Sequence, residues 1–269
     1  MQVAAIQMVS AIAVEANLAA AAALLHQAAD AGAELALLPE YFCHMGRAEQ
    51  DKLQVREEFG GGRIQDFLAG AARRHRLWIA GGTLPLAAGD TAHVRNTHLV
   101  FSPEGDCVTR YDKIHLFKFG DGREQYDESR VIEAGREPRS FTLPSRDGHA
   151  WKVGLSVCYD LRFPELYRGF GADLLLAPSA FTHTTGQAHW ELLLRARAVE
   201  NLAYMAAAAQ GGRHENGRRT WGHSMVVDPW GQVLAERTDE GAGVVVAELS
   251  AARLAQVRAQ LPALTHRVL

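Results

Sequence analysis

Residues 152–166 read KVGLSVCYDLRFPEL, and this stretch predicts how the chain folds. The apolar run 153–157 is typical of a buried β-strand, and Pro164 favours the first turn of a helix, where its missing N–H costs nothing. Cys158 then lies where the strand ends, at the carboxyl edge of a sheet, where backbone N–H groups can meet a developing negative charge. The pattern makes Cys158 a candidate nucleophile and the Tyr159 N–H a candidate oxyanion donor, with a buried structural thiol as the equal alternative.

Strand and helix patterns alternate along the rest of the chain. A helix is predicted over about 14–31, with Gly32 as its C-terminal stop. The segments 102–105 and 228–231 place proline second and glycine fourth, as in a type I turn that closes a hairpin. Further strands are predicted at 3–9, 34–38, 78–80, 97–101, 108–111, 174–176, 205–209, 225–227 and 244–247. We expect an α/β fold in one domain, residues 1–269, because no repeat or linker marks a boundary.

The composition narrows the class of function. The chain has 269 residues and a net charge of -3, and its basic residues do not run together, which argues against nucleic acid or an anionic membrane as a partner. Three widely separated cysteines and 12 histidines show no metal-ligand spacing, so we expect no metal. Free thiols, and a first segment unlike a signal peptide, predict a cytoplasmic protein, and no apolar segment is long enough to span a bilayer.

Two further charged residues follow apolar strand patterns. Glu40 follows the predicted strand 34–38 after Pro39, where a carboxylate can take a thiol proton and return it to a leaving amine. Lys113 ends the segment 108–113, where an ammonium near Cys158 can favour a thiolate and stabilise an oxyanion. Taken singly, each is more often an ordinary solvated charge, so the prediction depends on the three residues together.

Three short segments carry these residues: Leu38-Pro39-Glu40, the run YDKIHLF at 111–117 and the run CYDLRFPEL at 158–166. In order and rough spacing they resemble the signature motifs of the nitrilase (carbon-nitrogen hydrolase) superfamily. The resemblance implies a cofactor-free amidase with a four-layer αββα sandwich that pairs into a homodimer or higher homo-oligomer. It implies Glu40 as general base, Lys113 as oxyanion partner and Cys158 as nucleophile. Glu128, in a Glu-Ser segment, matches the second glutamate of the family and is expected to orient Lys113, with a surface-loop role as the alternative.

Within that superfamily the chain is similar to the Nit branch, through 178–198, 206–214 and 222–231. This similarity implies a small amide substrate bearing a carboxylate, namely deaminated glutathione, which is cleaved to 2-oxoglutarate and cysteinylglycine. Arg162 is a candidate partner for the substrate carboxylate, with an internal pairing to Glu165 as the equal alternative. Phe181 and Thr185 are weaker candidates for the substrate wall, and Phe181 is more often plain core.

Other functions share part of this pattern. An ω-amidase acting on 2-oxoglutaramate and an N-carbamoyl amino acid hydrolase would use the same three catalytic residues. A silent scaffold and a thiol-disulfide oxidoreductase are the alternatives from other classes, and the second lacks a resolving cysteine nearby. The chain departs from the family pattern at Lys118, where an acidic residue is usual, and in the charged segment 119–126. Both lie where a lid over the site can form, so the substrate specificity can differ from that of the nearest relatives.

Overall fold

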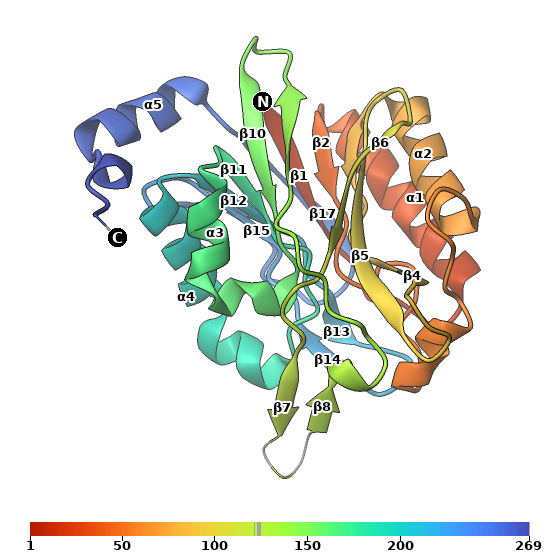
Figure 1. Ribbon diagram of the computed structural model, residues 1–269. Coiled ribbons are helices and arrows are strands. Elements are labelled where there is room, and N and C mark those ends of the chain that lie inside the picture. The colour runs from red at the N-terminus through yellow and green to blue at the C-terminus, as the bar shows by residue number, and fades with distance from the viewer. Residues whose placement is uncertain (121, 123–124, 269) are drawn as a thin grey trace.

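A computed structural model of the chain, which describes residues 1–120, 122 and 125–268, shows two large β-sheets lying face to face (Figure 1). The first sheet has the order β17 (Gly243–Glu248), β1 (Gln2–Gln7), β2 (Leu35–Leu37), β3 (Trp78–Ala80), β5 (Val94–Phe101) and β4 (Leu84–Ala87), and β6 (Cys107–Asp112) also pairs with β5. The second has the order β16 (Val233–Glu236), β15 (Met225–Val227), β12 (Tyr204–Ala207), β11 (Leu174–Leu176), β10 (Ala150–Leu155) and β9 (Ser140–Pro144). In both sheets the central strands are parallel and the edge pairs antiparallel.

Helices cover the outer face of each sheet. α1 (Val14–Asp30) and α2 (Arg63–His75) lie on the first sheet, at the right of Figure 1, and α3 (Pro164–Phe170) and α4 (His183–Asn201) lie on the second, at the left. α5 (Ala251–Gln260) follows β17 at the upper left of the view. The expected four-layer αββα sandwich is therefore confirmed.

Alternation along β1 shows why the central strands are apolar throughout. Val3 and Ala5 belong to the hydrophobic cluster between the two sheets, whereas Ala4 and Ile6 belong to the cluster under α1 and α2. All four side chains are fully buried, because a strand covered on both faces has no solvent side. Because the central strands are buried on both faces, their ends and the residues that follow them have little freedom to move.

Local expectations from turns and caps are confirmed. The Gly105 N–H donates to the Ser102 carbonyl at 2.8 Å between β5 and β6, and the Gly231 N–H donates to the Asp228 carbonyl at 2.9 Å between β15 and β16. Gly32 follows α1 with a φ of 81°, a conformation that glycine adopts without strain.

The polar, glycine-punctuated sequence of 117–139 favours a long loop, but the described part of this segment is not a loop throughout. The segment forms a hairpin of β7 (Lys118–Gly120) and β8 (Gln125–Asp127), followed by a short helical turn at Glu128–Arg130. Its strands are polar and short, so they carry no apolar alternation that would predict them. Positions 121, 123 and 124 of the charged segment 119–126 lie outside the described residues.

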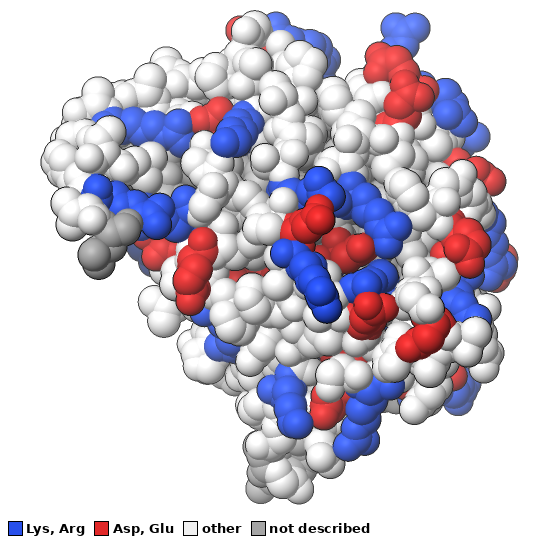
Figure 2. Space-filling model, viewed as in Figure 1, with Lys and Arg blue, Asp and Glu red and all other residues white. Residues whose placement is uncertain are grey.

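A second small hairpin, β13 (Gly211–Arg213) with β14 (Arg219–Trp221), lies beside α4. On the face shown in Figure 2, basic and acidic side chains are interspersed, as the composition predicts. In the part of the chain that the structure describes, no helix has the length and apolar character needed to cross a bilayer.

Candidate active site

A buried lysine joins two carboxylates at the end of β6. Lys113 follows β6 directly, and its Nζ donates to Glu40 Oε1 at 2.9 Å and to Glu128 Oε1 and Oε2 at 3.0 and 2.8 Å. Lys113 and Glu40 are each only 1% exposed. Burial works to lower the pKa of Lys113, but the carboxylates of Glu128 and Glu40 outweigh it and hold that pKa above its usual value. The lysine is therefore charged, and the two glutamates compensate the loss of its hydration.

Both oxygens of Glu128 are occupied. Oε1 accepts from Tyr41 Oη at 2.7 Å as well as from Lys113, and Oε2 accepts from the Phe117 N–H at 2.7 Å. Burial works to raise the pKa of Glu128, whereas the Lys113 charge and these hydrogen bonds hold it below its usual value. Glu128 is thus an ionised group whose oxygens have little capacity for another donor, and this arrangement suits a residue that holds Lys113 in position.

Glu40 differs from Glu128 in having one oxygen available. It follows β2 through Leu38 and Pro39, and its Oε1 accepts from Asn96 Nδ2 at 2.9 Å in addition to Lys113. Among the described residues no hydrogen bond reaches Oε2, and Glu40 lines the same pocket as Cys158. A carboxylate in this arrangement can accept a proton from a group in the pocket.

Cys158 lies on a tight turn rather than at the last residue of a strand. β10 ends at Leu155, and Cys158 begins a short helical turn, Cys158–Arg162, with a φ of 49°. Its N–H donates to the Pro178 carbonyl at 3.0 Å. A positive φ in a residue other than glycine is strained, and such strain is common where a side chain is presented for chemistry.

Asp160 holds this turn against the lysine segment. Its Oδ2 accepts from the Val157 N–H at 2.8 Å and from Tyr111 Oη at 2.7 Å, and its Oδ1 lies 3.1 Å from the His115 N–H and 2.6 Å from His115 Nδ1. The Asp160 carboxylate is fully buried. One side chain therefore fixes the cysteine turn relative to the residues on both sides of Lys113.

The thiol of Cys158 is protonated at rest. Burial, and then the Glu40 carboxylate, raise its pKa well above the usual value of a thiol, and the Lys113 charge offsets only part of this effect. A thiolate is the reactive form of cysteine, so reaction at this sulfur needs a base. Glu40 is the carboxylate with a free oxygen in the same pocket.

The pocket at Cys158 encloses about 290 Å³ of empty space, part of it open to solvent. Its lining includes Tyr159, Arg162, Phe181 and Thr185, so the structure brings all of these sequence candidates to one place. Lys113 lies behind Glu40 and Glu128 and is not part of the lining.

The two polar candidates for substrate contact, Arg162 and Thr185, differ in whether they are already paired within the protein. The guanidinium of Arg162 lies over the rings of Tyr159 and Phe181, with Nη2 at 3.3 Å from His189 Nδ1, and within the described chain it pairs with no carboxylate, Glu165 included. Thr185 instead shares its hydroxyl with Thr182 at 2.9 Å, at the first turn of α4. Arg162 therefore keeps its charge available to the pocket.

Sequence reasoning missed Arg218, Asp160, Asn96 and Tyr41. Arg218 lies in the turn between β13 and β14 and lines the pocket, and its Nη2 donates to the Ala180 carbonyl at 2.8 Å. Nothing in its local sequence marks it. Asp160 did carry a signal, because an aspartate that follows a strand end by a few residues often caps a turn.

The chain is similar to known proteins over nearly its whole length. The carbon-nitrogen hydrolase family model matches residues 2–259. A protein named deaminated glutathione amidase from Synechocystis is 41% identical over 98% of this chain and 97% of its own length. Nit3 of Saccharomyces cerevisiae, a member of branch 10 of the nitrilase superfamily, superposes with a TM-score of 0.85 at 30% identity, covering 97% of this chain and 94% of that one.

The chain is also similar to a mutant of the amidase from Nesterenkonia sp. AN1, in which acrylamide has added to the active-site cysteine. Its structure covers 97% of this chain and 98% of its own, with a TM-score of 0.76 at 27% identity. Among the described residues no group of three or more His, Cys, Asp or Glu side chains is placed to hold a metal ion. With family match, relatives and fold in agreement over nearly all of its length, the chain belongs to the carbon-nitrogen hydrolase family, within its Nit branch.

Proposed function

We propose that this protein is an amidase that hydrolyses deaminated glutathione to 2-oxoglutarate and cysteinylglycine through a thioester on Cys158. The observation that carries the proposal is the ion pair of Glu40 and Lys113, buried beside the pocket that Cys158 lines. Similarity to proteins named deaminated glutathione amidase, at 41% identity, supports the substrate.

Glu40 is the general base in the proposed first step. Its free Oε2 takes the proton of the Cys158 thiol, and the sulfur bonds to the amide carbon, whose oxygen becomes an oxyanion. The raised pKa of Cys158 supports this order, because a thiol that is neutral at rest needs a base during attack. When the carbon–nitrogen bond breaks, Glu40 returns the proton to the leaving amine.

Lys113 supplies positive charge to the oxyanion. At rest its three N–H donors face Glu40 and Glu128, so none is free for a substrate. Protonation of Glu40 weakens its hold on Lys113, and one N–H can then turn to the oxyanion beside the Tyr159 N–H. In this scheme proton transfer and oxyanion binding are linked through one carboxylate.

Hydrolysis of the thioester completes the cycle. Glu40 takes a proton from water, and the water oxygen bonds to the acyl carbon. When the carbon–sulfur bond breaks, Glu40 returns that proton to the sulfur, which gives the carboxylic acid and the thiol and restores the Glu40 carboxylate. Arg162 binds the α-keto carboxylate of the acyl group, because its guanidinium faces the pocket without an acidic partner among the described residues. Phe181 and Thr185 form the wall beside it.

A comparison of substrates tests this function. The enzyme is assayed with deaminated glutathione, 2-oxoglutaramate and an N-carbamoyl amino acid, and kcat/KM is expected to be highest for the first. A higher value for 2-oxoglutaramate would make the protein an ω-amidase instead. Failure to turn over any of the three, together with failure of a small electrophile to label Cys158, would favour a silent scaffold.

We propose that the protein is a homodimer that pairs through α4. Leu192 and Val199 are 67% and 44% exposed and lie seven positions apart on one face of α4. Trp230, 55% exposed, precedes Gly231, whose carbonyl accepts from Arg195 Nε of α4 at 2.9 Å. Grouped apolar side chains on a surface mark interaction sites. Sedimentation should give a dimer for the native protein and a monomer for Val199→Asp.

A reducing compartment, the cytoplasm, suits this chemistry because the proposed nucleophile must stay a free thiol. Cys43, Cys107 and Cys158 are all unpaired in the structure.

A further inference from the structure

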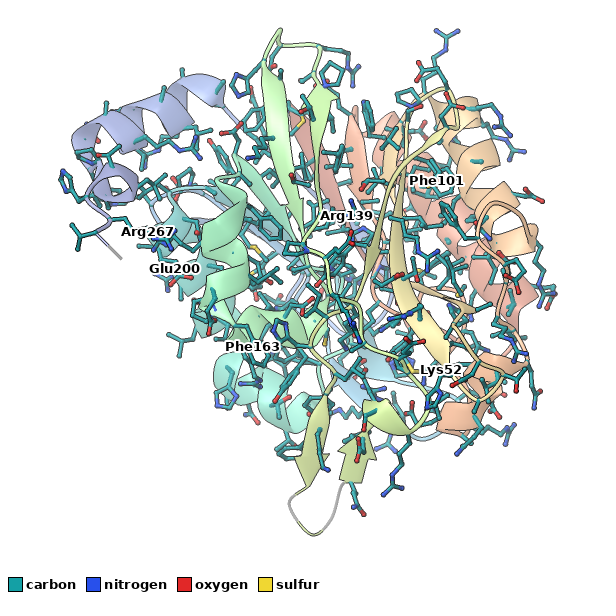
Figure 3. All side chains as sticks on the ribbon, in the orientation of Figure 1. Lys52, Phe101, Arg139, Phe163, Glu200 and Arg267 are labelled. Carbon is teal, nitrogen blue, oxygen red and sulfur yellow. The ribbon has the colours of Figure 1, made fainter. Side chains whose placement is uncertain are left out.

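A second cavity adjoins the pocket at Cys158. It holds about 680 Å³ of empty space and is lined by Tyr41, His44, Arg47, Lys52, Tyr126 and Arg218, among others. Arg218 lines both cavities, and Tyr41 connects the second one to the site through its hydrogen bond to Glu128. In Figure 3, Lys52 lies toward the end of the molecule at which β7 and β8 are drawn.

Three of the four charged side chains in the lining of this second cavity are basic, namely Arg47, Lys52 and Arg218, and the fourth is Glu49. Lys52 is paired with Glu49, and Arg47 lies 3.6 Å from Glu215. Arg218, in contrast, pairs with no carboxylate of the described residues, and its buried Nε has no hydrogen-bond partner there. A buried donor without an acceptor is unusual and destabilising, so this atom favours a ligand that brings an acceptor.

His44 provides a second buried atom without a partner. Its Nδ1 lies 2.7 Å from the Ile12 carbonyl and therefore carries the proton, which leaves Nε2 as an acceptor with no donor among the described residues. Burial, and to a smaller extent the charge of Lys52, lower the pKa of His44, so the neutral ring is the resting form. The cavity thus offers both a cationic donor and a neutral acceptor.

The leaving group of the proposed substrate carries matching chemistry. Cysteinylglycine is a dipeptide with one peptide N–H and a terminal carboxylate, and it extends roughly 7 Å beyond the scissile bond. Deaminated glutathione therefore has a carboxylate at each end, and the pocket has two guanidinium groups, those of Arg162 and Arg218. Only one of the two, Arg218, also faces the second cavity.

We infer that the second cavity is the leaving-group subsite, in which Arg218 binds the terminal carboxylate of the dipeptide amide while Arg162 binds the carboxylate of the acyl group. This inference rests on the proposed function. It adds that Arg218 is the residue by which the enzyme distinguishes a peptide-like amide substrate from a primary amide. A primary amide such as 2-oxoglutaramate releases ammonia and places nothing in the subsite.

The inference is tested with Arg218→Gln, which removes the charge, and Arg218→Lys, which keeps the charge but loses the planar fork. Arg219→Gln is the matched control, because Arg219 is the next residue, pairs with Glu240 and lines neither cavity. Each variant is assayed with deaminated glutathione and with 2-oxoglutaramate. The quantity compared is the ratio of the two kcat/KM values.

For Arg218→Gln the ratio should fall by about 10- to 100-fold, chiefly through a higher KM for deaminated glutathione, because one charge-assisted interaction is lost. Arg218→Lys should recover part of the ratio, and Arg219→Gln should leave it unchanged. If Arg218 only supported the loop at Ala180, both substrates would suffer alike and the ratio would stay constant, which would overturn the inference. A native enzyme inactive on both substrates would instead overturn the proposed function.

Discussion

Replacing Lys113 by methionine tests the buried charge cluster directly. Methionine is close to lysine in length, but it leaves Glu40 and Glu128 buried next to each other without a cation. Removing one partner of a buried ion pair costs about 3–5 kcal/mol of folding stability, because the remaining charge is uncompensated. We expect Lys113→Met to lose stability in this range at about pH 8.

The loss should shrink as the pH falls. In the native protein the Lys113 charge lowers the pKa of Glu128 against the effect of burial. Without that charge, burial alone raises the folded-state pKa of Glu128 above its unfolded value. A group with a raised folded pKa gains relative stability when it binds a proton, so the defect is relieved below that pKa and grows above it. Each pKa unit corresponds to about 1.4 kcal/mol, so a difference of about 1–2 kcal/mol between pH 8 and pH 5.5 is expected.

Urea unfolding at fixed protein concentration measures both effects. The double variant Lys113→Met with Glu128→Gln is the control, since it removes the group that titrates and should lose most of the pH dependence. A Lys113→Met protein within about 1 kcal/mol of the native one at both pH values would show that these groups do not form a charged cluster.

Three further predictions concern Cys158 and its turn. Cys158→Ala should abolish turnover while changing stability by less than about 2 kcal/mol, and Cys107→Ala, at an exposed cysteine, should stay active. The rate at which iodoacetamide alkylates Cys158, measured by mass spectrometry as a function of pH, should have its inflection above the usual pKa of a thiol. Glu40→Gln should move that inflection to lower pH, because the Glu40 carboxylate raises the pKa of Cys158. An inflection at neutral or acidic pH in the native protein would contradict the raised pKa. Asp160→Asn should lower the free energy of unfolding, measured in urea, by about 2–4 kcal/mol and should also lower kcat, because each Asp160 oxygen faces two donors. Unchanged activity would show that the turn keeps its conformation without the carboxylate.

The sandwich and the main strands could be predicted because apolar runs report burial. Residues 35–37, 78–80, 174–176 and 225–227 are buried strands almost as their sequence predicts, since both faces of each strand are covered. The hairpin of β7 and β8 could not be predicted in this way, because Lys118, Gln125 and Asp127 show no apolar alternation.

At the site, the sequence places Glu40, Lys113, Glu128 and Cys158 after separate elements, and family resemblance is what brings them into one prediction. The structure shows the contacts that link the first three and the pocket that Cys158 shares with Glu40. Their catalytic roles remain predictions for the experiments above.

Arg218 and Asn96 could not be predicted from sequence, because their value to the site lies in distant partners. Arg218 reaches Ala180 across 38 positions, and Asn96 reaches Glu40 across 56. Neither pairing leaves a local pattern, and an arginine in a hairpin or an asparagine in a strand is ordinary on its own.

The central claim is that the Cys158 sulfur forms a covalent bond to the acyl group of the amide. Protein mixed rapidly with excess deaminated glutathione and quenched in acid is measured by mass spectrometry, first intact and then after digestion. The account predicts a protein heavier by one 2-oxoglutaryl group, with the added mass on the peptide that contains Cys158. An acyl group attached to any other side chain, or a native rate of hydrolysis in Cys158→Ala, would contradict it.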